Sequence, residues 1–198
     1  MKFSASPNDN IPASLVKIRM EAMANAILIA DDSAPDIALL GRLFEQIRLS
    51  NPTFVVTDGE QTINYLAGSK EFSDRNRFPL PMLLLLDLRM PKKDGFEVLR
   101  WIRANSINCA VVVLTSLQEV KVVREAYALG ALSFLIKPVG EEEFRNMMIG
   151  VPGMSIASDG GRLELRYEPV PKPKQFTADI MVFPPAEVAR ESPKSKLS

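Results

Sequence analysis

Five polar side chains in this sequence have the types needed for chemistry on a small anion, and each directly follows a short apolar run. They are Asp31 and Asp32, Asp87, Thr115 and Lys137. Carboxylates that lie close together repel one another, and a hard divalent cation relieves that repulsion. Oxygen ligands without histidine or cysteine indicate magnesium. A lysine and a hydroxyl beside the cation would hold a tetrahedral oxyanion.

This set of side chains is suited to phosphoryl transfer onto a carboxylate. Asp87 would be the nucleophile. Lys137 and the cation would offset charge on the phosphoryl oxygens, and Thr115 would donate a hydrogen bond to one of them. Taken singly, each residue is better explained as a turn former, a helix cap or a solvated lysine. The interpretation therefore depends on all of them meeting at one edge of the fold.

The residues that the sequence lacks exclude several other sites. It contains no histidine and one cysteine, Cys109. A histidine-based triad, an imidazole metal site, a phosphohistidine, an internal disulfide and a cysteine-rich zinc site are all excluded. Twenty-four basic residues balance 24 acidic ones, so the formal net charge of zero gives no support for DNA binding. If the chain takes part in a phosphorelay, another protein must supply the phosphohistidine.

Alternating apolar runs and helical patterns place the polar residues at the ends of strands. The runs have strand length, and the segments between them repeat apolar residues at helical spacing. Strands are predicted at residues 26–30, 53–56, 82–86, 110–114 and 132–136, and helices from the cap Ser33 to Ile47 and at 59–66, 96–103, 119–129 and 141–149. This alternation is typical of a parallel sheet covered by helices on both faces. Ligands of such sheets bind beyond the carboxyl ends of the strands.

Two flanking segments differ in composition from the central part. Residues 1–25 are predicted to be a polar N-terminal extension, and residues 151–198 a tail that contains seven prolines. Within that tail, Arg162–Tyr167 alternates and predicts one strand or hairpin arm, whereas Ile180–Phe183 could be a linear motif. Docking of the tail, pairing of edge strands in a homodimer and a disordered linker all stay open. Because no signal peptide or membrane-spanning run is visible, a cytoplasmic protein is expected.

Residues 26–150 resemble the receiver domain of a bacterial two-component response regulator. The motifs that carry this resemblance are ILIADDS at 27–33, LLLLDLRMPKKDGFEVL at 83–99, VVVLTS at 111–116 and GALSFLIKP at 130–138. The resemblance implies a flavodoxin-like, doubly wound α/β fold with a five-stranded parallel sheet in the order 2-1-3-4-5. It also implies a stand-alone regulator, because no output domain is recognisable in the tail.

The resemblance assigns a role to each of the polar residues. It implies that Asp87 is the phosphoacceptor and that Thr115 and Lys137 bind the phosphoryl oxygens. Asp31, Asp32, Asp87 and the backbone carbonyl of Arg89 would hold Mg²⁺, and Asp32 is favoured over Asp31 as a direct ligand. Phosphotransfer would come from a sensor histidine kinase or a histidine phosphotransfer protein, and the output would be contact with an unknown downstream protein.

Further expectations concern a switch in the protein's conformation. Phe134 occupies the position of the family's switch aromatic residue, and it would move together with Thr115 after phosphorylation. The bond between Lys137 and Pro138 is expected to be cis. Two departures are that Phe134 is not tyrosine and that Arg89 stands where the family tunes attack by water on the phosphoryl group.

Three functions other than that of a phosphorylated receiver are alternatives for this sequence. An aspartyl phosphohydrolase would need a second aspartate where Arg89 stands, and no glycine-rich loop of a nucleotide-binding module is present. A degenerate receiver that acts only as a structural adaptor stays open as the alternative. We expect no conventional enzyme, only a protein that promotes its own aspartyl phosphorylation and dephosphorylation.

Overall fold

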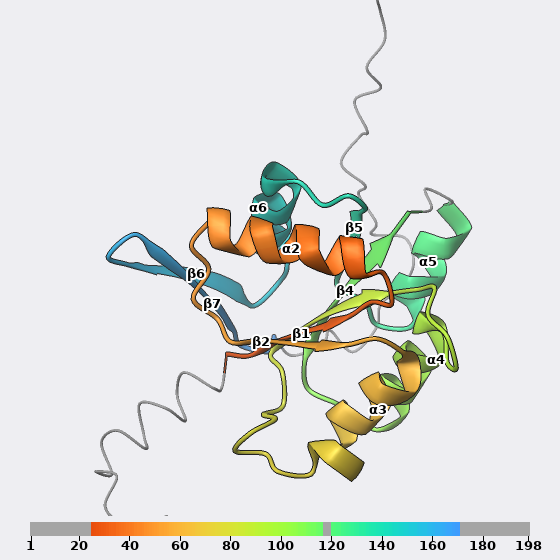
Figure 1. The fold of residues 1–198 in the computed structure, drawn as a ribbon. Coiled ribbons are helices and arrows are strands. Elements are labelled where there is room, and N and C mark those ends of the chain that lie inside the picture. The colour runs from red at the N-terminus through yellow and green to blue at the C-terminus, as the bar shows by residue number, and fades with distance from the viewer. Residues whose placement is uncertain (1–24, 117–119, 171–198) are drawn as a thin grey trace, which may run out of the picture.

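The computed structural model describes residues 25–116 and 120–170, which contain a five-stranded parallel sheet and a separate two-stranded one. The large sheet has the order β2-β1-β3-β4-β5, as the sequence predicted (Figure 1). Its strands are β1 (Ile27–Ala30), β2 (Thr53–Val56), β3 (Leu83–Asp87), β4 (Ala110–Thr115) and β5 (Ser133–Ile136). All four strand pairs are parallel. The carboxyl ends of the strands therefore lie at one edge of the sheet.

Helices cover the sheet on both faces (Figure 1). They are α2 (Ala34–Gln46), α3 (Gly59–Ala67), α4 (Gly95–Ala104), α5 (Val120–Ala128) and α6 (Glu141–Gly150), with a short 3₁₀ helix, η1 (Lys70–Phe72), after α3. Side chains of α2 and α6 pack on one face of the sheet, and side chains of α3, α4 and α5 on the other. The predicted start of the fourth main helix, at Glu119, lies outside the described residues.

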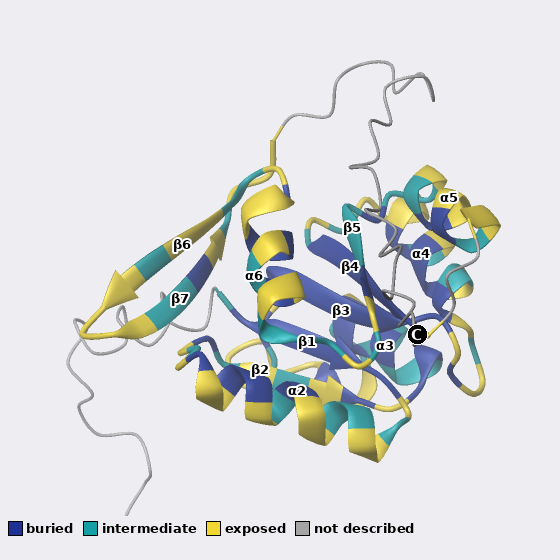
Figure 2. Ribbon diagram, turned by 90° about the horizontal axis from the view of Figure 1, so that it is seen from above, coloured by how far each residue is buried: buried dark blue, intermediate teal, exposed yellow. Residues whose placement is uncertain are grey.

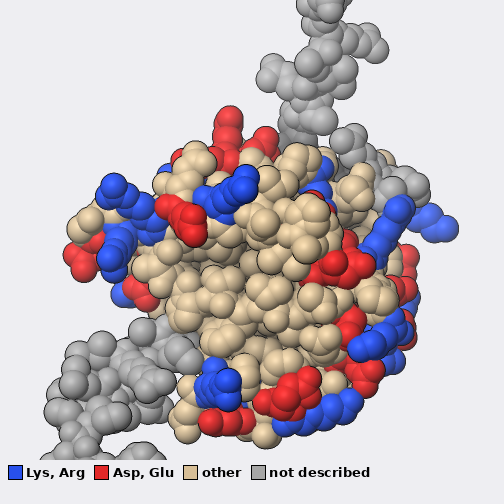
Figure 3. Space-filling view, viewed as in Figure 1, with Lys and Arg blue, Asp and Glu red and all other residues tan. Residues whose placement is uncertain are grey.

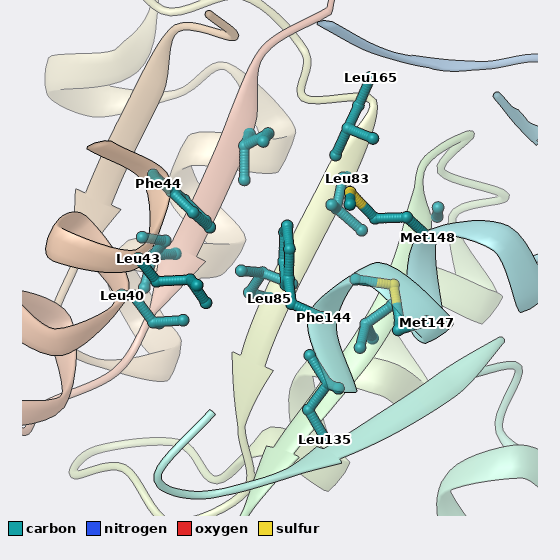
Figure 4. Close-up of a cluster of buried hydrophobic side chains, with 14 of the residues drawn as sticks. Leu40, Leu43, Phe44, Leu83, Leu85, Leu135, Phe144, Met147, Met148 and Leu165 are labelled. Carbon is teal, nitrogen blue, oxygen red and sulfur yellow. The ribbon is translucent and has the colours of Figure 1, made fainter. Parts of the chain in front are cut away.

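The central strands are buried throughout because their side chains alternate between two apolar clusters. Leu83 and Leu85 of β3 point to the cluster under α2 and α6, where Phe44 and Phe144 meet with ring centroids 5.2 Å apart (Figure 4). Leu84 and Leu86 point to the opposite cluster under α3, α4 and α5. Buried residues accordingly line the central strands, whereas the outer sides of the helices are exposed (Figure 2). This rigid core fixes the ends of β1, β3 and β4.

Local signals in the sequence explain where the helices begin. The hydroxyl of Ser33 accepts a hydrogen bond from the amide of Asp36, and Pro35 stands in the first turn of α2. Asp94 and Glu97 form a capping box at the start of α4. Helix α2 begins shortly after β1 and the two aspartates that follow it. Helix α4 begins after the loop that follows β3 and contains Arg89.

A hairpin follows α6 and contacts residues just before β1 and β2, at the end of the sheet opposite the carboxyl edge. It consists of β6 (Met154–Asp159) and β7 (Arg162–Tyr167), which are antiparallel. The strand predicted at Arg162–Tyr167 is β7, whereas its partner β6 was not identified from the sequence. Leu165 is fully buried in the cluster under α2 and α6. Thus the first part of the segment after residue 150 packs against the receiver-like core, while Ile180–Phe183 lies outside the described residues.

The side chain of Asn51 ties the hairpin to the sheet. Its amide nitrogen donates to the carbonyl oxygens of Asn25 and Leu165, at 2.7 and 2.9 Å, and its oxygen accepts a 2.8 Å hydrogen bond from the amide of Leu165. The Leu163 amide and carbonyl also form hydrogen bonds with the backbone of Arg48 and Ser50. The hairpin is therefore held by polar contacts as well as by apolar packing.

Within the part of the chain that the structure describes, no helix has both the length and the apolar character needed to cross a membrane.

Candidate functional site

Lys137 lies at the centre of a group of carboxylates at the carboxyl edge of the sheet. Its Nζ is 2.6 Å from Asp31 Oδ2, 2.9 Å from Asp87 Oδ2 and 3.1 Å from Asp36 Oδ2. The backbone brings it there because β5 pairs with β4, and the Lys137 amide donates to the Thr115 carbonyl at 2.9 Å. The bond between Lys137 and Pro138 is cis, as expected from the sequence.

The three predicted metal ligands are brought together by β1 and β3. One carboxylate oxygen each of Asp31, Asp32 and Asp87 lies within 4.8 Å of the others. Asp31 and Asp87 are buried and Asp32 is exposed. Since all the donors are carboxylate oxygens, the cluster has the chemistry that a hard divalent cation prefers. The exposed Asp32 leaves the cluster open to solvent on one side.

Backbone amides orient the two buried carboxylates. Asp31 Oδ1 accepts a 2.9 Å hydrogen bond from the Ser33 amide, and Asp87 Oδ1 accepts one of 3.1 Å from the Arg89 amide. Asp31 directly follows β1 and Asp87 is the last residue of β3, and in each case the chain then turns so that the amide two residues later meets the aspartate side chain. The loop after β3 is thereby tied to Asp87, which places the backbone of Arg89 beside the site.

Burial and ion pairing act in opposite directions on the charged groups. Burial raises the pKa of Asp31 above its ordinary value, although the hydrogen bonds from Lys137 and from the Ser33 amide lower it. Burial also tends to lower the pKa of Lys137, but its hydrogen bonds to Asp31 and Asp87 outweigh burial, and its pKa is raised. Lys137 therefore stays protonated and is the positive charge that opposes these aspartates.

Asp36 is a site residue that the sequence analysis missed. It is the acidic residue of the first turn of α2. The helix dipole favours acidic residues at such positions in many helices, so the residue type did not indicate a functional role. In the structure its carboxylate turns to Lys137 and, with a side chain 30% exposed, is the most accessible of the three carboxylates that contact this lysine. Only the position of Asp36, four residues after Asp32, could have suggested that its side chain faces the carboxyl edge of the sheet.

The two predicted switch residues lie on neighbouring strands. Thr115 is buried at the end of β4, and the backbone pairs it with Ile136, the residue before Lys137. Phe134 of β5 is half-buried, and its ring meets Tyr127 of α5 edge-on at a centroid distance of 6.3 Å. The structure thus connects the site to α5 through β5.

Curated relatives match the central part of this chain. A probable methanogenesis regulatory protein, FilR2, of Methanothrix harundinacea is 34% identical over 60% of this chain and 76% of its own length. Sporulation initiation phosphotransferase F of Bacillus subtilis is 29% identical, over 63% of this chain and 90% of its own. Response regulator Rcp1 of Synechocystis is 31% identical, over 63% of this chain and 84% of its own length.

Solved structures agree with the fold. The bacteriophytochrome response regulator RtBRR is 35% identical, with a TM-score of 0.60 over 66% of this chain and 79% of that one. The Mn²⁺-bound form of Rcp1 is 30% identical, with a TM-score of 0.54 over 62% of this chain and 88% of that one. The family model of the response regulator receiver domain matches residues 27–149. With the sheet order and the acidic edge, this match shows that the chain belongs to the response regulator receiver domain family of two-component phosphorelay proteins.

Proposed function

We propose that this chain is a response regulator receiver that accepts a phosphoryl group on Asp87. The observation that carries the proposal is the contact of Asp87 with Lys137 together with its closeness to Asp31 and Asp32. A carboxylate so placed has a positive group ready to offset charge on an incoming phosphoryl group. A receiver that acts only as a structural adaptor would have no need for this complete set.

The acidic cluster suits Mg²⁺. Asp31, Asp32 and Asp87, with the backbone carbonyl of Arg89, would hold the ion, and when bound it would offset negative charge on the phosphoryl oxygens. The choice of ligands is supported by the oxygen-only cluster and by the receiver family, in which Rcp1 has been crystallised with Mn²⁺. The ammonium group of Lys137 pairs with two of these aspartates at the same edge and is a second positive charge beside the phosphoacceptor.

The reaction is a displacement at phosphorus. A carboxylate oxygen of Asp87 attacks the phosphorus of a phosphohistidine, a P–O bond forms, and the P–N bond breaks with its electron pair leaving on the imidazole. The donor must be another protein, because this chain has no histidine. A sensor histidine kinase or a histidine phosphotransfer protein is the donor that the family supports. Lys137 Nζ and the Thr115 hydroxyl would bind the phosphoryl oxygens.

The output of this regulator would be contact with another protein. Phosphorylation would draw Thr115 toward the phosphoryl group, and Phe134 would move behind it and change the surface of α5 and β5. On the face shown in Figure 3, acidic and basic side chains are interspersed around a broad uncharged area. Such a face and a net charge of zero favour a protein partner over DNA.

Phosphorylation by a small-molecule donor tests this proposal. The chain is incubated with acetyl phosphate and Mg²⁺, and its intact mass is measured with and without a chelator. We expect an acid-stable, alkali-labile gain of one phosphoryl group that the chelator and Asp87→Asn both abolish. Asp74→Asn, in an exposed loop, is the matched control and should gain the group normally. A folded wild-type protein that gains nothing would favour the structural adaptor instead.

A further inference from the structure

The loop between β3 and α4, residues 88–94, carries the backbone of Arg89 and must be held in place for the site to form. One end is fixed by the fold itself, because the Gly95 amide donates to the Leu88 carbonyl at 3.1 Å. A Cβ at Gly95 would lie 2.5 Å from the carbonyl oxygen of Asp87, so the start of α4 packs directly against the end of β3. The middle of the loop needs a separate restraint.

A buried aspartate between β2 and α3 contacts the middle of this loop. Asp58 caps α3, accepting a 2.7 Å hydrogen bond from the Gln61 amide, and its Oδ2 is 2.6 Å from Lys92 Nζ. The Asp58 side chain is 4% exposed, although Lys92 reaches out into solvent. These hydrogen bonds and the Lys92 charge outweigh the opposing effect of burial and lower the pKa of Asp58. The carboxylate is therefore charged and oriented at neutral pH.

The backbone of α3 also touches the loop without any side chain between them. A Cβ at Gly59 would overlap the carbonyl oxygen of Lys93. Lys92 itself has a φ of +65°, which is unfavourable for a residue with a side chain. An ion pair with a buried carboxylate compensates for an unfavourable backbone conformation. Asp58, Gly59 and Lys92 thus form one unit, here called the loop clamp.

We propose that the loop clamp positions Arg89 and Asp87 for binding the divalent cation. The inference rests on the proposed function, in which the Arg89 carbonyl and the three aspartates hold that ion. Arg89 lies three residues before Lys92, and its amide already donates to Asp87 Oδ1. Restraining Lys92 therefore limits the orientations of the Arg89 peptide groups relative to Asp87. Asp58 and Lys92 do not touch the ion, so they are positioning residues.

The neighbouring lysine provides a matched control for this idea. Lys93 makes a 3.6 Å ion pair with Glu97 at the surface of α4, and its ammonium group takes no part in the clamp. Only its backbone carbonyl and Cβ lie against Gly59, and methionine keeps both. Lys92→Met and Lys93→Met remove the same charge from adjacent positions of one loop. Only the first leaves Asp58 without its lysine. Residues that orient metal ligands typically change metal affinity by about tenfold or more.

Binding of Mn²⁺ alone, measured by the paramagnetic resonance of the free ion, is the readout. We expect Lys92→Met to raise the Kd for Mn²⁺ by about tenfold, whereas Lys93→Met stays within about twofold of wild type, since a lost surface pair has little effect. Lys92→Arg should restore the affinity, because it restores the ion pair. Asp58→Asn, which keeps a cap for α3, should weaken binding as Lys92→Met does. Circular dichroism at the same temperature shows that each variant is folded.

The results separate the clamp from the function on which it depends. Equal Mn²⁺ affinity of folded Lys92→Met and Lys93→Met, with tight binding by wild type, would overturn the clamp and leave the proposed function standing. Failure of the wild-type protein to bind Mn²⁺ would overturn both. An unchanged affinity in Asp58→Asn would likewise show that the buried carboxylate does not position the loop.

Discussion

Replacing Lys137 by methionine removes the positive charge that three aspartates share. The substitution keeps an unbranched side chain only one atom shorter but leaves the carboxylates facing one another. Asp36 is 30% exposed and can turn to water, whereas Asp31 and Asp87, at 0% and 10%, cannot. Removing one partner of a buried ion pair destabilises a protein by about 3–5 kcal/mol. We therefore expect a loss of that size in the free energy of unfolding at neutral pH in a chelator.

The loss should depend on pH and on divalent ions in a defined direction. Burial already raises the pKa of Asp31, and the substitution removes the hydrogen bond and charge that lower it. A carboxyl group whose pKa in the folded protein lies above its unfolded value of 3.8 destabilises the fold when it is ionised. This destabilisation disappears as the pH falls through the folded pKa, because the group then becomes neutral. Mildly acidic pH should therefore restore part of the stability, and so should millimolar Mg²⁺, because the ion binds the folded state.

Urea unfolding of wild type and Lys137→Met, at neutral and mildly acidic pH, measures both effects. Lys70→Met is the control, since it breaks an ion pair with Glu60 whose side chains are 57% and 44% exposed. We expect that control to change stability by less than about 1 kcal/mol. A Lys137→Met protein as stable as wild type at neutral pH, or one whose loss is the same at both values of pH, would refute the electrostatic account of the site.

Three other predictions follow from contacts away from the phosphoacceptor. Asn51→Ala leaves the amide and carbonyl of Leu165 without their side-chain partner and should cost about 1–3 kcal/mol in urea unfolding; equal stability would show that the hairpin is not held by Asn51. Asp58→Asn should lose stability at neutral pH, and this loss should fade as the pH falls below 3.8 and through the lowered folded pKa, because the ionised form of the carboxyl group provides that stability; a loss independent of pH would contradict this. Burial raises the pKa of Cys109 to about 12, so iodoacetamide should label it far more slowly in the native protein than in urea; rapid native labelling, followed by mass spectrometry, would be the opposite result.

The sequence was most informative where one strong local signal decided the structure. Apolar runs predicted all five strands of the parallel sheet to within a residue at each end. The signal was strongest for β1, β3 and β4, because strands buried on both faces must be apolar, whereas the edge strands β2 and β5 are partly exposed. The same runs placed Asp31, Asp87 and Lys137 at the carboxyl edge, and the structure brings them into contact there. Parallel pairing alone is sufficient for that convergence.

Contacts between residues far apart in the chain could not be derived in this way. Asp36 reaches Lys137 across 101 positions, and an acidic residue in a first helical turn has an adequate local explanation. The strand β6 (Met154–Asp159) mixes small and polar residues, so its pairing with β7 gave no periodic signal. The ion pair of Asp58 with Lys92 depends on a backbone conformation of Lys92 that residue types do not predict.

The position of the phosphoryl group tests the central claim most directly. After treatment with acetyl phosphate and Mg²⁺, borohydride reduces an aspartyl phosphate to homoserine, and tandem mass spectrometry of the peptides locates the changed residue. The account predicts homoserine at position 87 and unchanged aspartate at positions 31, 32 and 36. Homoserine at one of those positions instead, or a stable phosphate elsewhere in the chain, would contradict the assignment of Asp87 as the phosphoacceptor.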